Sequence, residues 1–311
     1  MGRFDTAFFS FLFCFSSLCN AATLGTPPKR VAIVTGGTRG IGRGISESLA
    51  AQGFDLLLTY NSDADAAAES AKRLTSEYPD CKVECVGGDV SLESTRDAIF
   101  ECFDKCFGSE QQLGAMVHNA GQYVGITSTN ADGLPAAMLG FGDGSMLPPN
   151  GGAASLETMH YYQRLYGDAF VDLCERGLAR MEDGGGSLVG ISSPGCTLQY
   201  NPNMGYDMPG SGKCVMEYAM RLFALRAAKK KINCNVVVPG VTESDAWGKL
   251  AETRGVDRDE MVQGIAGRIC PMGTTLSAKE VGDVVAFLCG PQGRVITGVS
   301  LPADGGVHLK T

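Results

Sequence analysis

The stretch VAIVTGGTRGIGRGISESLAAQG, residues 31–53, decides the fold. Its first part is a short apolar run typical of a buried strand, and its second part has the spacing of an amphipathic helix. Between them, glycines at positions 36, 40 and 42 permit a tight turn and a close approach of the backbone to a ligand. A strand, a glycine-rich turn and a helix amino terminus together predict a cradle for a pyrophosphate group.

The same alternation of strand-like and helix-like segments continues along the chain. Amphipathic segments include those at about 159–181 and 211–230, and a last one is AKEVGDVVAFLCG. Further strand-like runs are FDLLLTY (54–60), KVECVGGDV (82–90), AMVHNAG (115–121), SLVGISS (187–193), INCNVVVPG (232–240) and GVSLPADGG (298–306). This order predicts one α/β domain over residues 29–311, a doubly wound parallel sheet of about seven strands with helices on both faces.

Composition restricts the class of partner. The 311 residues are 44% hydrophobic, which suits one large core, and the formal net charge is −8 without a long run of Lys or Arg. Such a chain is not expected to bind nucleic acid or an anionic membrane surface as its main partner. We therefore expect a small-molecule substrate.

The cysteines and histidines do not form a recognisable site. Twelve cysteines are scattered through strand-like and helix-like segments, and no CxxC motif occurs. This distribution favours free, mostly buried thiols over a disulfide framework or a zinc site. His118 and His160 are interpreted as structural, and no metal site is expected.

The first 25 residues differ from the rest of the chain. They contain Arg3, an apolar stretch from Ala7 to Leu18 and small residues near Ala22, which is the shape of a signal peptide. The apolar stretch is about 12 residues, short of the roughly 20 that cross a membrane. We predict the secretory or endomembrane route, with a plastid or cytoplasmic location and weak membrane association through this leader as alternatives.

Residues 124–153 break the alternation. This segment is rich in Gly, Pro, Asn and Asp and has no hydrophobic period, so it is predicted to be a long loop. It follows a strand on the side where ligands bind in parallel sheets. A substrate lid and a disordered insertion are the two interpretations.

The charge around the glycine turn indicates which dinucleotide binds. Arg39 lies inside the turn, and the second strand ends at Tyr60 and Asn61, where an NAD-selective site would place a carboxylate on the ribose 2′-hydroxyl. A cation without an opposing anion favours a 2′-phosphate, so NADP(H) is the predicted cofactor. The predicted cradle residues are Gly36, Thr38, Arg39, Gly40, Ile41 and Gly42, with Tyr60 beside them.

Six motifs in a fixed order carry a family resemblance. They are TGGTRGIG (35–42), GGDV (87–90), HNAG (118–121), ISS (191–193), NCNVVVPG (233–240) and DGG (304–306). From about Lys29 to His308 the chain resembles the short-chain dehydrogenase/reductase family. The resemblance implies a Rossmann-type domain, hydride transfer between a nicotinamide cofactor and a carbonyl, an alcohol or an activated double bond, and a homodimer or homotetramer.

The resemblance also assigns roles to the cofactor-binding segments. It implies that Asp89 and Val90 hold the adenine. It places a second segment beside the cofactor ribose and a third on the nicotinamide amide, with Lys213 counted in the cofactor set as well. The segment beside the ribose is Asn119, Ala120 and Gly121. The segment on the nicotinamide amide is Pro239, Gly240 and Thr242.

For catalysis, the resemblance implies a serine, a tyrosine and a lysine. Ser193 would orient the reacting oxygen, and Lys213, which lies 26 residues before Pro239, would lower the pKa of the tyrosine that transfers the proton. In the usual Tyr-x-x-x-Lys spacing the tyrosine position is occupied by Pro209, which has no acidic proton. Tyr206, 13 residues after Ser193, is the predicted acid/base.

Alternatives follow from these departures. Tyr200 is a further candidate hydroxyl, and the spacing from Tyr206 to Lys213 resembles that of the enoyl-thioester reductase branch. Pro209 fits the first turn of a helix and pushes Met208 toward an extended conformation, which would leave Tyr206 on the chain entering the helix.

One more departure affects the proton relay. Many family members carry an asparagine that holds a relay water where this chain has Tyr166, and a tyrosine cannot reproduce the donors and acceptors of an amide. The sequence predicts an NADP(H)-dependent reductase of a carbonyl in a small or lipid-like substrate. An enoyl-thioester reductase and a catalytically impaired NADP(H)-binding regulatory protein are the alternatives.

Overall fold

The structure is a computed structural model. It describes residues 29–108, 111–121, 156–194, 196, 207–244, 247–248, 251–252 and 255–309. The leader, the segment 124–153, Tyr200 and Tyr206 lie outside the described residues, so the predictions made for them stay predictions.

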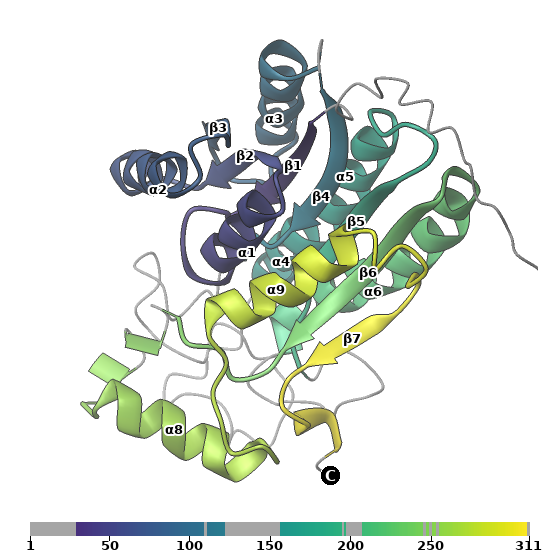
Figure 1. The fold of residues 1–311 in the computed structure, drawn as a ribbon. Coiled ribbons are helices and arrows are strands. Elements are labelled where there is room, and N and C mark those ends of the chain that lie inside the picture. Colours follow the sequence, from purple (N-terminus) through teal and green to yellow (C-terminus); the bar gives the residue numbers. More distant parts are fainter. Residues whose placement is uncertain are drawn as a thin grey trace, which may run out of the picture.

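The described residues contain one parallel sheet of seven strands in the order β3-β2-β1-β4-β5-β6-β7. Every neighbouring pair is parallel, which confirms the predicted doubly wound sheet (Figure 1). The strands are β1 (Arg30–Thr35), β2 (Asp55–Tyr60), β3 (Val83–Gly87), β4 (Gln112–His118), β5 (Gly186–Ile191), β6 (Ile232–Pro239) and β7 (Ser300–Ala303).

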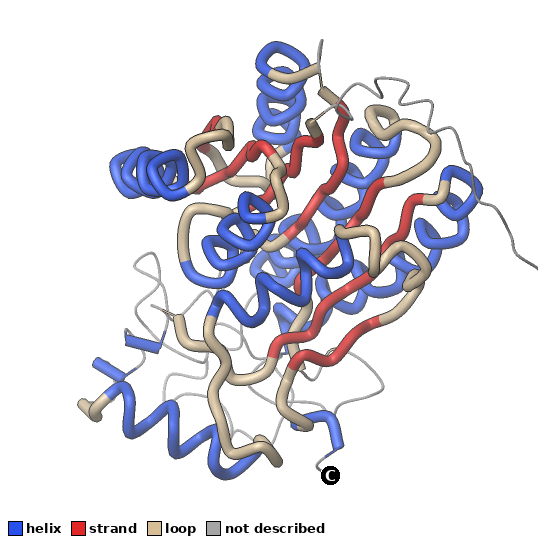
Figure 2. The backbone as a smooth tube through the Cα atoms, in the orientation of Figure 1, coloured by secondary structure: helices blue, strands red, loops and turns tan. Residues whose placement is uncertain are grey.

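Helices cover both faces of this sheet (Figures 1 and 2). One face carries α1 (Gly40–Ala51), α2 (Ala64–Glu77) and α9 (Ala278–Cys289). The other carries α3 (Glu93–Cys106), α4 (Leu156–Tyr162), the π-helix η2 (Gln163–Asp168), α5 (Ala169–Leu178) and α6 (Asp207–Ala227). The remaining described helices are η3 (Ala228–Lys230), α8 (Arg258–Ile269) and η4 (Val307–Leu309).

Burial on both faces explains the composition of the central strands. All eight residues of β6 are buried, as are the last five of β1, so buried and exposed positions do not alternate along these strands. The side chains above and below the sheet form two separate apolar clusters, one under each layer of helices. The sheet therefore separates two apolar cores and contributes side chains to both.

Two predictions about helices need correction. The helix predicted at about 159–181 is interrupted by η2, which divides it into α4 and α5. The helix predicted from about Ser211 begins at Asp207, so Met208 is helical and not extended. Proline disfavours a helical residue before it without forbidding one, and Pro209 sits where backbone N–H groups have no partner inside the helix.

The ten cysteines of the described part, Cys81 to Cys289, are all free, and six of them are buried. For these ten residues the structure agrees with the prediction of free, mostly buried thiols. In the same part of the chain, no three or more His, Cys, Asp or Glu side chains gather as a metal site would require. None of the described helices has the length and apolar character needed to cross a membrane.

The backbones of helices α1 and α9 are in direct contact. A Cβ on Gly44 would lie 2.1 Å from the carbonyl oxygen of Ala278, and a Cβ on Gly282 would lie 2.2 Å from the carbonyl oxygen of Gly44. Only glycine fits at both positions. The capping box of Ser277 and Glu280 fixes the start of α9 beside this contact.

Replacing Gly282 with alanine tests this contact. The added methyl group would force the two helices apart, and overpacking of this kind costs about 1–3 kcal/mol or more. We expect Gly282→Ala to lower the free energy of unfolding by that amount in urea titrations.

Gly264→Ala on α8 is the matched control, because a Cβ there meets nothing within 4 Å. It should raise stability by about 0.5–1 kcal/mol, since alanine forms helix better than glycine. Equal effects from the two variants would contradict the proposed backbone contact.

Candidate active site

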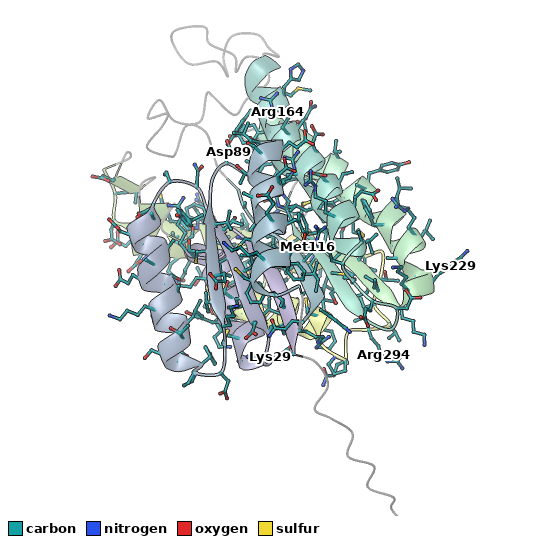
Figure 3. The ribbon with its side chains drawn as sticks, turned by 90° about the horizontal axis from the view of Figure 1, so that it is seen from above. Lys29, Asp89, Met116, Arg164, Lys229 and Arg294 are labelled. Carbon is teal, nitrogen blue, oxygen red and sulfur yellow. The ribbon has the colours of Figure 1, made fainter. Side chains whose placement is uncertain are left out.

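The candidate site lies at the carboxyl edge of the sheet. Strand order reverses at β1, which has β2 on one side and β4 on the other, and ligands of doubly wound sheets bind at such a point. Figure 3 shows Asp89 and Arg164 at this end of the molecule and Lys29, which precedes β1, at the opposite end. The segments predicted to bind the cofactor follow β1, β3, β4 and β6 on this edge.

Neighbouring protein atoms leave no room for a side chain at two glycines of the turn after β1. Gly36 has φ of +63°, and a Cβ on Gly42 would lie only 2.0 Å from the carbonyl oxygen of Gly36. In contrast, a Cβ on Gly40 would meet nothing within 4 Å, at the first residue of α1. The turn is therefore closed toward the protein and open at the helix amino terminus, as a pyrophosphate cradle requires.

The HNAG motif braces this turn from β4. The Asn119 side-chain amide donates to the carbonyl oxygens of Thr35 (3.1 Å) and Gly36 (3.2 Å). The Thr35 hydroxyl accepts the backbone N–H groups of Asn119 (3.0 Å) and Ala120 (2.9 Å). The predicted ribose segment is thus fixed directly to the predicted phosphate cradle.

His118 extends the same network into the core. The Thr35 hydroxyl already accepts two N–H groups, so its own proton is directed at His118 Nδ1, 3.0 Å away. His118 Nε2 then carries a proton and donates to the carbonyl oxygen of Leu165 at 2.9 Å. Burial lowers the pKa of His118 to about 4, so the ring is neutral and links β4 to η2. This agrees with the structural role predicted for His118.

The predicted adenine end is formed by three separate segments. Gly87 lies against the Tyr60 ring, because a Cβ on Gly87 would be 2.8 Å from it. The Asp89 carboxylate accepts the backbone N–H of Ser91 at 2.9 Å and the Tyr161 hydroxyl at 3.3 Å. Burial and the nearby Asp89 raise the pKa of Tyr161 to about 12, so its hydroxyl remains a donor. Tyr161 was not predicted, because nothing in its local sequence distinguishes it.

The other residues predicted to bind the cofactor lie in or beside the loops at this edge of the sheet. Thr38 and the exposed Arg39 complete the turn before α1, and Ile41 packs on the apolar cluster under α1. Val90 is buried after β3. Pro239 ends β6, Gly240 donates its N–H to Ala303 at 3.0 Å, and the Thr242 hydroxyl donates to the Gly240 carbonyl oxygen at 3.1 Å.

Ser193 and Lys213 converge on the end of β5. Ser193 is partly exposed two residues after the strand, and the Lys213 ammonium donates to the carbonyl oxygen of Ile191, the last residue of that strand, at 3.0 Å. Lys213 is buried on α6, and burial lowers the pKa of its amine to about 8. The structure therefore places the Lys213 ammonium at the end of the strand that leads to Ser193, while Tyr206 lies outside the described residues.

Glu217 is a buried charge that the sequence did not indicate as important. It lies one turn after Lys213 on α6, and its carboxylate accepts hydrogen bonds from the hydroxyls of Ser192 and Ser300, the latter at 2.7 Å. Burial raises the pKa of Glu217, whereas the two hydroxyls and Lys213 act in the opposite direction. Glu217 thereby ties the residue next to Ser193 to β7.

Comparison with family models identifies the fold and its chemistry. A model described as "short chain dehydrogenase" matches residues 30–135, and one described as "Enoyl-(Acyl carrier protein) reductase" matches residues 150–308. The chain belongs to the short-chain dehydrogenase/reductase family. The protein is therefore an oxidoreductase with the Rossmann-type fold, as the ordered motifs indicated.

Similar proteins of this family include several reductases. Hydroxynaphthalene reductase-like protein Arp2 of Metarhizium anisopliae is 26% identical over 89% of this chain and 94% of its own length. Carbonyl reductase family member 4 of Danio rerio is 29% identical over 90% and 99%. The 1-cyclohexenylcarbonyl-CoA reductase of Streptomyces collinus is 27% identical over 90% and 88%.

Solved structures of the family share the same fold. L-sorbose reductase from Gluconobacter frateurii, complexed with NADPH and L-sorbose, has a TM-score of 0.73 and 24% identity over 91% of this chain and 98% of that one. The angucycline C-6 ketoreductase LanV with bound NADP has a TM-score of 0.71 and 25% identity over 90% and 96%.

Proposed function

We propose that the protein reduces a carbonyl of a small or lipid-like substrate to an alcohol, with NADP(H) as the cofactor. The observation that carries this proposal is the Lys213 ammonium bound to the end of β5, two residues before Ser193, at the same edge of the sheet as the glycine turn. Such a site offers a hydrogen-bond donor and a positive charge to an oxygen that becomes negative during reduction. The carbonyl and ketone reductases among the similar proteins support the same reaction class.

The choice of NADP(H) is supported by the charge around the cradle. Arg39 precedes α1 with its side chain exposed, and β2 ends at Tyr60 without a carboxylate at its tip. A guanidinium can form a bidentate pair with a 2′-phosphate, which an unphosphorylated ribose cannot accept. Several structures of similar fold are described with NADPH or NADP, which is consistent with this choice.

In the proposed mechanism, the glycine turn would hold NADPH, which would supply the hydride that reduces the carbonyl carbon. Ser193 donates a hydrogen bond to the substrate oxygen and orients it. Tyr206 would give its phenolic proton to the same oxygen, and the positive charge of Lys213 would stabilise the phenolate that remains. Lys213 is held for this task by the carbonyl oxygen of Ile191.

Reduction of an enoyl thioester is the second candidate function. Two observations favour it: Tyr206 and Lys213 are seven residues apart, and the similar proteins include a 1-cyclohexenylcarbonyl-CoA reductase. In this reaction the same hydroxyl would stabilise an enolate oxygen while the hydride adds to the double bond. The cradle is equally suited to both reactions.

Substitution of the two tyrosines tests the reaction and the identity of the acid/base. We expect the purified protein to oxidise NADPH with acetoacetyl thioester or with members of a carbonyl panel, and faster than with crotonyl thioester. Tyr206→Phe should lower kcat by roughly 10²–10⁴-fold, as loss of a general acid does, while Tyr200→Phe serves as the matched control.

The other outcomes distinguish the alternatives. Preference for crotonyl thioester would replace the carbonyl assignment with enoyl reduction. If Tyr206→Phe keeps full activity and Tyr200→Phe loses it, Tyr200 would be the acid/base. NADPH binding without hydride transfer to any substrate would support the regulatory alternative and overturn both enzymatic proposals.

Arg39→Ala tests the cofactor assignment. Hydrogen bonds to charged groups contribute about 1.5–3 kcal/mol, so the Kd for NADPH should rise roughly 10- to 100-fold while weak NADH binding stays unchanged. Arg43→Ala, one turn further along α1, removes a similar charge that pairs with Glu47 and should leave both affinities within about twofold. Equal loss of NADPH and NADH binding in Arg39→Ala would count against recognition of the 2′-phosphate.

We further propose that the protein forms a homodimer or homotetramer through α6. Large apolar side chains of Val215, Tyr218, Leu222 and Leu225 are exposed there, and their spacing places them on one side of the helix. Such a stripe is typical of a surface that is covered in an oligomer.

A charge in this stripe should therefore dissociate the oligomer. We expect Leu225→Glu to reduce the molar mass in light scattering to that of the monomer, whereas Val295→Glu, at an exposed apolar residue between α9 and β7, should not. A monomeric wild-type protein, or a Leu225→Glu variant of unchanged mass, would refute this interface.

A further inference from the structure

Tyr166 is a buried residue of η2 whose ring faces the candidate catalytic lysine. The Lys213 nitrogen lies over the ring, 4.6 Å from its centroid. This is within the range of about 6 Å in which the negative face of an aromatic ring attracts a cation. The sequence drew attention to Tyr166 only because it stands where many family members carry an asparagine. In the structure it is a direct neighbour of Lys213.

A buried ammonium needs such compensation. Lys213 is 6% exposed, and removal from water disfavours its charged form. The carbonyl oxygen of Ile191 accepts one of its N–H groups, and an ammonium has three donors. Attraction of a cation by a ring face is stronger in a desolvated place than at the surface.

The contact between α6 and the η2 region is built for this geometry. A Cβ on Gly212, the residue before Lys213, would lie 2.3 Å from the carbonyl oxygen of Tyr162, and a Cβ on Gly167 would lie 2.9 Å from the Val215 side chain. The two missing side chains let α6 approach the backbone that carries Tyr166. Glycine at position 212 therefore permits the close approach of α6 to η2, on which Tyr166 lies.

The Tyr166 ring is also fixed from its sides. The Tyr162 ring lies parallel to it, with centroids 6.0 Å apart and an angle of 4° between the planes. A Cβ on Gly121 would be 3.1 Å from the Tyr166 hydroxyl, so this hydroxyl reaches the segment predicted to lie beside the cofactor ribose. The side chain therefore spans from the ribose segment to Lys213 and has little freedom to turn.

We propose that Tyr166 is a positioning residue that holds the Lys213 ammonium against the face of its ring, in the place where many family members carry an amide. The ring, and not the hydroxyl, performs this role. The inference rests on the proposed function for its effect on turnover, but the protonation of Lys213 can be measured without any substrate.

Other titratable groups also face Lys213. Glu217 lies one turn along α6, the Cys196 thiol comes from the segment after β5, and His118 lies on β4. Cys196 and Glu217 both favour the ammonium, and neutral His118 contributes little charge at neutral pH. Removing the ring should therefore lower the pKa of Lys213 from its present value of about 8, with Glu217 still in place.

The experiment is an NMR titration of the apo protein with lysine labelled at Cε, in which the Lys213 signal is identified by its loss in Lys213→Met. Tyr166→Phe keeps the ring and should titrate within about 0.3 pH units of wild type. Tyr166→Leu removes the ring and should titrate about one pH unit lower, equivalent to about 1.4 kcal/mol. Tyr166→Met is a second ringless variant, since an unbranched side chain fills irregular space if leucine prevents folding.

Tyr162→Leu is the control for packing damage, because it removes the stacked neighbour and leaves the ring under Lys213. Its Lys213 titration should match wild type more closely than that of Tyr166→Leu. Unchanged titration in Tyr166→Leu or Tyr166→Met would overturn the proposal, as would an equal fall in Tyr166→Phe, which would assign the effect to the hydroxyl.

A kinetic readout follows if the protein is the proposed reductase. The ammonium would be lost at lower pH in the ringless variants, so the alkaline limb of kcat should move to lower pH by the same unit, and Tyr166→Phe should keep the wild-type profile. Absence of any turnover would refute the proposed function but leave the NMR result interpretable. A shifted titration with an unshifted kinetic profile would show that Tyr166 does not act through Lys213 in catalysis, which contradicts the positioning role.

Discussion

The site depends on the hydrogen bonds that join the ends of β1 and β4. The Thr35 hydroxyl accepts two N–H groups from the Asn119–Ala120 segment, and Asn119 returns two hydrogen bonds to the carbonyl oxygens of Thr35 and Gly36. Parallel strands with helical crossovers leave a gap at the reversal of strand order, and backbone groups there would otherwise need water. The hydrogen bonds between Thr35 and the Asn119–Ala120 segment satisfy these backbone groups. They also fix the glycine turn in the shape that a pyrophosphate needs.

A second property of the site is the burial of charge. Lys213 and Glu217 both lie inside the protein, one turn apart, and each is held by groups from other elements: Ile191 for the lysine, and Ser192 and Ser300 for the glutamate. Buried charges are costly unless paired or hydrogen-bonded, so their partners must keep fixed positions. The ends of β5 and β7 are consequently coupled to α6, and the geometry around Ser193 follows from that coupling.

The sequence predicted the fold well because hydrophobic periodicity and glycine turns are local signals. The alternation after residue 31 was sufficient for seven parallel strands, and the spacing to Pro239 located Lys213. The contacts of Glu217 and Tyr166 could not be predicted, because both residues lie on helices and their neighbours come from other elements. The start of α6 was predicted too late for a related reason: the local preference of Met208 before proline was outweighed by the rest of the helix.

The glycine contact between α1 and α9 also affects how the chain can mature during synthesis. Helix α1 ends at Ala51, and α9 begins at Ala278, so more than two hundred residues must be made before the second helix is present. At translation rates of about 5–20 residues per second this interval is roughly 10–45 s. During that time α9 has not been made, so the side of α1 that packs against it has no partner while the chain is on the ribosome. The packing around the glycine turn is therefore completed late in synthesis, when α9 has been made.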